Sequence, residues 1–73
     1  MPSRLELYGF TDNDGNPAEL IVVEVSPSHI EYIFNNGMNP HSMTRELWDS
    51  EIAIGNMWFI RTVTEQEADE WRG

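Results

Sequence analysis

The chain contains no cysteine, so neither disulfides nor thiolate metal sites can hold its fold together. Its 73 residues predict one small domain, spanning residues 1–73. A domain of this size buries only about 60% of the surface of its unfolded chain. Hydrophobic residues make up 40% of the sequence, which is enough for a core. The stability margin is thin, and self-association or binding to a partner often supplies the difference.

No segment has the pattern of a membrane span or a secretory signal. The longest purely apolar run, Leu20–Val23, is far shorter than the ~18 residues that a membrane helix needs. The chain does not open with a charged segment followed by an apolar stretch. The sequence therefore predicts a small, soluble, cytoplasmic protein.

A β-hairpin is predicted over residues 4–25. Leu5 and Leu7 alternate with polar neighbours in the first strand, residues 4–10. Residues 11–17 concentrate turn-forming side chains, and Gly15 can take the positive φ that such a turn requires. Residues 18–25 are rich in β-branched residues and carry apolar side chains on both faces. This pattern is typical of a central strand, or of one covered on both faces at one end.

A helix is predicted over residues 28–36. Two N-cap signals begin it: Ser26 is followed by a proline, and Ser28 is followed three residues later by a glutamate. Apolar residues then recur with helical spacing, at Ile30, Ile33 and Phe34. The run Asn-Asn-Gly at 35–37 is expected to end this helix.

The middle of the chain has two interpretations. Residues 38–42 are predicted as a loop, and residues 43–54 fit either a strand or a short helix. Extended structure is favoured because Gly55 and Asn56 are typical of a two-residue turn between strands 52–54 and 57–59. The second of these strands extends over residues 57–63. Alternation predicts that one of its faces carries Met57, Phe59 and Val63, and the other Trp58, Ile60 and Thr62.

A C-terminal helix is predicted over residues 65–72. Thr64 and Glu67 have the spacing of a capping box, and Val63 and Ala68 that of a hydrophobic staple. Ala68 and Trp71 are its expected inward contacts. The fold class predicted from all these elements is α+β. It consists of a small antiparallel sheet of about four strands in two β-hairpins, one helix packed on a face, and a short C-terminal helix.

The chain carries no recognisable motif for catalysis or for binding a metal or cofactor. Counted from Asp12, a calcium loop would need glycine where Pro17 stands and a bidentate glutamate where Val23 stands. His29 and His41 lack the HExxH spacing of a helical zinc site. No serine lies in a GxSxG elbow, and the glycines are scattered. We therefore expect a protein that is not an enzyme, with no catalytic, cofactor or metal site.

The charge balance constrains the partner. Thirteen Asp and Glu residues oppose four Arg and no Lys, giving a formal net charge of −9. Such a charge disfavours direct binding to nucleic acid, because affinity for phosphates comes from cationic side chains. It favours association with a basic protein surface, steered by attraction that weakens as salt rises. Solubility alone is the other explanation for the charge, and it stays open at this point.

Aromatic side chains add a second signal. Three tryptophans and two tyrosines are more than so small a core can enclose. Exposed aromatic anchors surrounded by acids are typical of a protein-binding hot spot. Candidate partner-binding residues come from the hairpin tip, outward strand positions and the last helix. They are Asp12, Asp14, Glu6, Glu24, Trp58, Glu65, Asp69 and Glu70.

The run Leu5–Thr11, the acidic turn after it and the Ser26-Pro27 pair resemble the opening of some bacterial immunity-protein families. Those families neutralise a toxin by binding it. The likeness covers the first third of the chain and carries over no functional residue.

From charge and aromatic content we expect an acidic protein that docks on and inhibits a basic protein partner, such as a nucleic-acid-handling enzyme or complex. A toxin-immunity protein and a phage-encoded antagonist of a host defence both fit. The alternative is a small homo-oligomeric structural or accessory subunit, for example a homodimer that pairs through the two-sided apolar strand 20–25.

Overall fold

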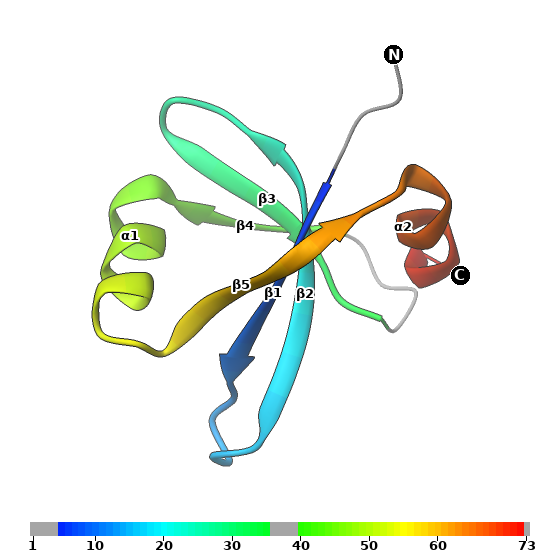
Figure 1. Ribbon diagram of the computed structural model, residues 1–73. Coiled ribbons are helices and arrows are strands. Elements are labelled where there is room, and N and C mark those ends of the chain that lie inside the picture. The colour runs from blue at the N-terminus through cyan, green and yellow to red at the C-terminus, as the bar shows by residue number, and fades with distance from the viewer. Residues whose placement is uncertain (1–4, 36–39, 73) are drawn as a thin grey trace.

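The computed structural model describes residues 5–35 and 40–72, which form one antiparallel sheet and two helices (Figure 1). The strands are β1 (Leu5–Thr11), β2 (Pro17–Val25), β3 (His29–Ile33), β4 (His41–Thr44) and β5 (Met57–Val63). The helices are α1 (Arg45–Ala53), before β5, and α2 (Glu65–Arg72), after it. The strand order is β4-β3-β2-β1-β5, so the last strand returns to pair with the first. The α+β class is confirmed, with five strands rather than about four.

The predicted hairpin of β1 and β2 is confirmed. The two strands pair from Glu6 opposite Val22 to Thr11 opposite Pro17. Between them, Gly15 takes a φ of 82°, the left-handed conformation expected of a turn glycine. The Asp12 carboxylate accepts hydrogen bonds from the backbone N–H groups of residues 14 and 16, each at 2.9 Å. The acidic turn is therefore stabilised from within.

The helix predicted over residues 28–36 is wrong, because residues 29–33 form β3 and pair with β2. Ser26 closes the turn between these strands rather than capping a helix. Its Oγ accepts from the N–H of His29 at 3.0 Å, and its own N–H donates to the His29 carbonyl at 2.9 Å. Ile30 and Ile33 belong to different buried clusters, so their spacing is that of a strand covered on both faces. The expected helix end at 36–37 lies outside the described residues.

The extended structure favoured for residues 43–54 is also wrong beyond Thr44. Residues 41–44 form β4, two of them in the predicted loop 38–42, while residues 38 and 39 lie outside the described part. Helix α1 begins directly afterwards, and the Thr44 Oγ1 caps it by accepting from the N–H of Leu47 at 3.2 Å. Gly55, with a φ of 81°, therefore connects a helix to β5 rather than two strands.

Strand β5 is confirmed, and its predicted faces hold up to Ile60 but are exchanged beyond it, at Thr62 and Val63. Leu7 lies opposite Arg61, whereas Tyr8 lies opposite Phe59, so Ile60 is an extra residue in the pairing with β1. Such a bulge reverses the alternation of side chains along the strand. Val63 and Met57 accordingly lie in different buried clusters.

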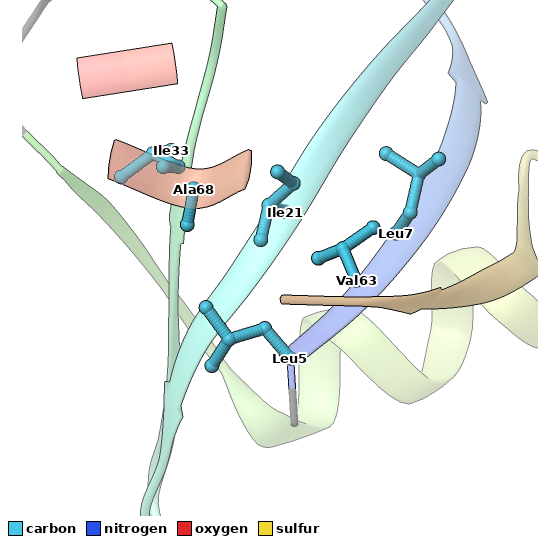
Figure 2. Packing of buried hydrophobic residues seen from close by; sticks show 6 residues of the cluster. All are labelled: Leu5, Leu7, Ile21, Ile33, Val63 and Ala68. Carbon is cyan, nitrogen blue, oxygen red and sulfur yellow. The ribbon is translucent and has the colours of Figure 1, made fainter. Parts of the chain in front are cut away.

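Two buried clusters occupy opposite faces of the sheet. One contains Leu5, Leu7, Ile21, Ile33, Val63 and Ala68 (Figure 2). The other contains Leu20, Val22, Ile30, Trp48 and Met57. Consecutive residues of β2 point to opposite faces, so Ile21 in the first cluster and Val22 in the second place the clusters on opposite sides. Helix α2 therefore covers one face through Ala68, and α1 covers the other through Trp48. We call these the α2 face and the α1 face. Strand β2 is central and covered on both sides, as predicted.

The C-terminal helix is confirmed as α2. The Thr64 Oγ1 accepts from the N–H of Glu67 at 3.2 Å, which is one half of the predicted capping box. Val63 and Ala68 are buried in the same cluster, as the staple requires, and Trp71 packs against it. Within the described residues, neither helix is long and apolar enough to cross a membrane.

Candidate functional site

Helix α2 packs over one end of its face, and a shallow hollow lies further along the same face. Gly9 of β1 pairs with Glu19 of β2 on one side and with Trp58 of β5 on the other. The hollow has a volume of about 430 Å³, and its lining comes from three strands. The lining residues are Gly9, Pro17, Ala18, Glu19, Trp58 and Ile60. We call it the Gly9 hollow.

The Trp58 indole lies across β1 at Gly9. A Cβ atom built on Gly9 would stand only 2.5 Å from the indole Nε1 and 2.6 Å from Cε2. The indole can adopt this position only because residue 9 has no side chain. The tryptophan side chain nevertheless remains 42% exposed, so it presents aromatic surface to solvent.

Glu19 is exposed beside this indole, and the nearby cation points elsewhere. The Arg61 guanidinium donates to both carboxylate oxygens of Glu67 on α2, at 3.2 and 2.7 Å. This hydrogen bonding raises the pKa of Arg61 and lowers the pKa of Glu67. The charge of Glu19 raises the Arg61 pKa further. Glu19 itself has no ion-pair partner among the described residues.

The structure brings three of the eight predicted residues to this end of the molecule. The N–H of Thr11 donates to the carbonyl of Asn56 at 3.2 Å, which joins the hairpin turn to the start of β5. Asp12, Asp14 and Trp58 therefore lie near the same end of the sheet. Asp14 is exposed, whereas the Asp12 side chain is engaged in its own turn.

The other five predicted residues lie elsewhere. Glu65, Asp69 and Glu70 belong to α2, which packs at the opposite end of β1 from the hairpin turn (Figure 1). Asp69 is paired with Arg72 at 2.8 Å. Glu24 lies near the end of β2 that is remote from the hairpin turn, opposite Glu31 of β3.

Glu6 lies on the face opposite the hollow. It shares this face with Tyr8, two residues further along β1. The Tyr8 hydroxyl donates to its carboxylate at 3.1 Å. Burial raises the pKa of Tyr8, and the charge and hydrogen bond of Glu6 raise it further. The eight candidate residues thus do not form one continuous surface.

The three tryptophans have different environments. Trp48 is 5% exposed and meets Tyr8 edge to face, with ring centroids 5.0 Å apart. Trp71 is half-buried against the core, and Trp58 is the most exposed of the three. The count of aromatic residues indicated that at least one of them is exposed, and the packing shows that this tryptophan is Trp58.

Sequence reasoning missed Gly9, Glu19 and Ile60 as members of a site. Gly9 carried a usable signal, because a glycine inside a strand often marks a close approach by another group. Ile60 lies beside Trp58, as the alternation predicts, but no local pattern indicates that it is 40% exposed in a hollow.

Three further features bear on function. A smaller hollow of about 220 Å³ is lined by Glu24, Ser26, His29, Glu31 and Ser42. Across residues 5–35 and 40–72, no three histidine or carboxylate side chains gather in a way that could hold a metal ion. Of the thirteen carboxylates, only Glu67 and Asp69 form ion pairs with the arginines of that part of the chain. Most carboxylates therefore have no arginine partner in the described residues, which fits the net charge of −9.

Comparison with known proteins adds no relative: no family model, curated protein or solved structure matches the chain.

Proposed function

We propose that this protein is a non-catalytic acidic binding protein that docks on a basic protein surface and inhibits the partner by covering it. The observation that supports this most is the Gly9 hollow, where exposed Trp58 lies beside Glu19, a carboxylate with no ion-pair partner in residues 5–35 and 40–72. A nucleic-acid-handling enzyme or complex is the expected partner class, because its substrate groove is basic. A toxin-immunity protein and a phage-encoded antagonist of host defence would both act in this way.

The hollow combines the two elements that a binding hot spot uses. Trp58 and Ile60, 42% and 40% exposed, supply apolar area that a partner would remove from water. The carboxylates around them supply attraction that speeds encounter with a cationic surface. Affinity would therefore depend on the tryptophan, and the rate of association on the net charge of −9.

Affinity capture from a lysate of the source organism, followed by binding and inhibition assays with the purified partner, tests this proposal. The baits are the wild-type chain, Trp58→Ala and Glu19→Gln. Glu46→Gln is the matched control, because it removes the same charge from an exposed position on α1, on the other face.

We expect one basic protein to remain bound to the wild type and to Glu46→Gln at a salt concentration that releases the bulk of adsorbed protein. Trp58→Ala should lose it, and Glu19→Gln should bind it more weakly. The purified partner should lose activity when the wild-type chain is added. Capture of many basic proteins, released uniformly by salt from all four baits, would contradict the proposal.

A homo-oligomeric subunit remains the second candidate, but not through the strand first proposed. Leu20, Ile21 and Val22 are buried within the chain, so within residues 20–25 the large exposed apolar side chain is Val25, at 57%, and it offers a second copy little area. The feature that favours self-association is instead the outer edge of β5, which has no strand partner in the described part of the sheet. Phe59 on this edge strand is 52% exposed. Unpaired edges of this kind can template pairing between copies.

Light scattering at two protein concentrations separates the two candidates. An acidic binding protein is expected to have the 8.5 kDa mass of one chain at both concentrations. A dimer that persists on dilution would favour the homo-oligomeric subunit.

A further inference from the structure

We propose that the Gly9 hollow receives an arginine side chain of the partner, with its guanidinium stacked on the Trp58 indole and paired with the Glu19 carboxylate. This inference rests on the proposed function and specifies the side chain that the site takes. It follows from three observations: what stands on either side of Gly9, what lines the hollow, and where the nearby cation is held.

The first observation is the placement of an aromatic ring and a carboxylate over a common floor. Glu19 and Trp58 flank Gly9 in register on neighbouring strands, so their α-carbons are separated by about 10 Å, two strand spacings. The indole leans over the glycine, which brings its Nε1 edge to within 2.5 Å of where a Cβ would stand. A planar cation lying on the exposed surface of the indole would meet the ring and be directed toward the carboxylate beside it.

The second observation is the lining of the hollow, which favours arginine over lysine. A guanidinium stacks on aromatic rings and presents a planar fork of donors to a carboxylate, whereas an ammonium is a compact and strongly hydrated charge. Pro17, Ala18 and Ile60 complete the lining with apolar surface. Such surface suits the methylene groups of a long cationic side chain.

The third observation is that the chain's own nearby cation is engaged by another carboxylate rather than by Glu19. Arg61 is close enough for the charge of Glu19 to raise its pKa, yet its guanidinium is engaged by both oxygens of Glu67. Glu19 is consequently left without an ion-pair partner in the described structure, in a surface of net negative charge. An arginine from outside would supply the charge that this carboxylate lacks.

Nuclear magnetic resonance titration of the 73-residue chain with three short capped peptides tests the inference. The peptides are identical except for a central arginine, lysine or citrulline, so that they separate charge from planar shape. The signals to follow are the Trp58 indole N–H and the Gly9 amide. Each variant is first checked for the dispersed spectrum of the folded protein.

We expect the arginine peptide to shift both signals saturably, to bind about two- to fivefold more tightly than the uncharged citrulline peptide, the range given by an exposed cation–π contact, and to bind more tightly than the lysine peptide because its planar fork fits both groups. The citrulline peptide should bind more weakly than either. Glu19→Gln should weaken binding of the arginine peptide by about two- to fivefold, as loss of an exposed ion pair does, and Glu46→Gln should leave it unchanged. Gly9→Ala should weaken it by displacing the indole.

Equal binding of the arginine and citrulline peptides would overturn the inference. So would equal weakening by Glu19→Gln and Glu46→Gln, because it would show attraction to the overall charge rather than to the hollow. Because Glu19 is exposed, its variant gives a clear answer even where a change at Trp58 disturbs folding.

The failure of this inference can be told apart from failure of the proposed function. A purified basic partner that binds Glu19→Gln and Gly9→Ala as tightly as the wild type would refute the arginine site and leave docking on a basic protein intact. Binding of the arginine peptide at Trp58, with no partner captured from the lysate, would refute the proposed function and leave the site intact.

Discussion

Gly9 and Trp58 depend on each other. A glycine in the middle of a strand costs roughly 0.5–1 kcal/mol relative to alanine, because the unfolded chain gives up more freedom. Here it leaves room for an indole that would otherwise meet a Cβ atom at 2.5 Å. The exposed tryptophan of the proposed site is therefore positioned by the absence of a side chain on its neighbour.

A double-mutant cycle measures this dependence. We expect Gly9→Ala to destabilise the wild type, because the new methyl group displaces the indole. In a Trp58→Ala background the same change should stabilise the fold by about 0.5–1 kcal/mol, through the lower entropy of the unfolded chain. Urea unfolding followed by circular dichroism gives the four free energies. A change of the same sign in both backgrounds would show that the indole does not depend on Gly9.

The Arg61–Glu67 pair makes stability depend on pH in a defined direction. Hydrogen bonding to Arg61 holds the folded-state pKa of Glu67 below its ordinary value of 4.5. A carboxyl group with a lowered pKa contributes stability above its unfolded pKa, and that contribution is lost as pH falls through the folded pKa. The difference in unfolding free energy between the wild type and Glu67→Gln should therefore shrink as pH falls below the ordinary value.

Urea midpoints measured from about pH 6 down to about pH 3 provide the comparison. Glu65→Gln is the control, because its carboxylate is exposed in the same helix turn and has no arginine partner in the described structure. A wild-type advantage over Glu67→Gln that stays constant over this range would exclude the pair as its source.

At the scale of single elements, two identical capping patterns had opposite outcomes. Thr64 and Glu67 begin α2 as their spacing predicts, with the threonine Oγ1 accepting from the N–H of residue 67. Ser28 and Glu31 have the same spacing, but they lie in a tight turn and in β3. The capping box describes what a helix start would need, and it does not decide whether a helix forms.

The outcome at β3 was decided by pairing with the strands on either side of it in the sheet. Residues 29–33 are hydrogen-bonded between β2 and β4, so both edges of this short strand are occupied. Its apolar residues, Ile30 and Ile33, contribute to both buried clusters. A helix of about ten residues is marginal on its own, so pairing and burial on two sides prevail over local propensity.

Helix α1 is held to the sheet by one large side chain. Trp48 is its buried residue, and it joins the cluster of the α1 face. Trp48→Ala should cost about 3–5 kcal/mol, the range for removing a buried aromatic side chain. Trp58→Ala, which removes an exposed indole, should cost much less.

Urea unfolding of the two variants compares these costs directly. A chain of this size has only about 4–11 kcal/mol of total stability, so Trp48→Ala is expected to lose much of it and to unfold if the starting value is at the low end of that range. Trp48→Phe then gives the graded loss that can be measured. Equal stability of Trp48→Ala and Trp58→Ala would contradict the assignment of Trp48 to the core.

On the scale of the whole molecule, the net charge of −9 lowers the stability of the folded state. Like charges repel more strongly in the compact state than in the unfolded chain. Only two carboxylates are neutralised by ion pairs with arginines of the described residues, so most of this repulsion remains. An acidic surface of this kind costs stability in the free protein, and contact with a cationic partner would relieve it.

Salt should therefore stabilise the isolated protein. Raising sodium chloride from about 10 mM to about 150 mM shortens the screening length from about 30 Å to about 8 Å. The urea midpoint is expected to rise over this range, and a triple variant with fewer charges, Asp14→Asn, Glu46→Gln and Glu70→Gln, should rise less. A midpoint that falls with salt would show that the two ion pairs outweigh the repulsion.

The sequence by itself determined whatever depends on neighbouring residues: the hairpin of β1 and β2, the strand β5, the capped helix α2 and the negative charge. Tertiary structure decided what depends on distant residues. Pairing with β2 and β4 made residues 29–33 a strand, the packing of Trp48 placed α1 on the sheet, and the bulge at Ile60 exchanged the faces of β5 beyond it.

The candidate site belongs to this second group. Glu19 and Gly9 belong to one hairpin, but Trp58 is far from both in sequence and joins them only because β1 also pairs with β5. Turn and cap signals act through hydrogen bonds a few residues long, so local sequence is enough to specify them. A surface assembled from three strands depends on their register, which the whole sheet sets together.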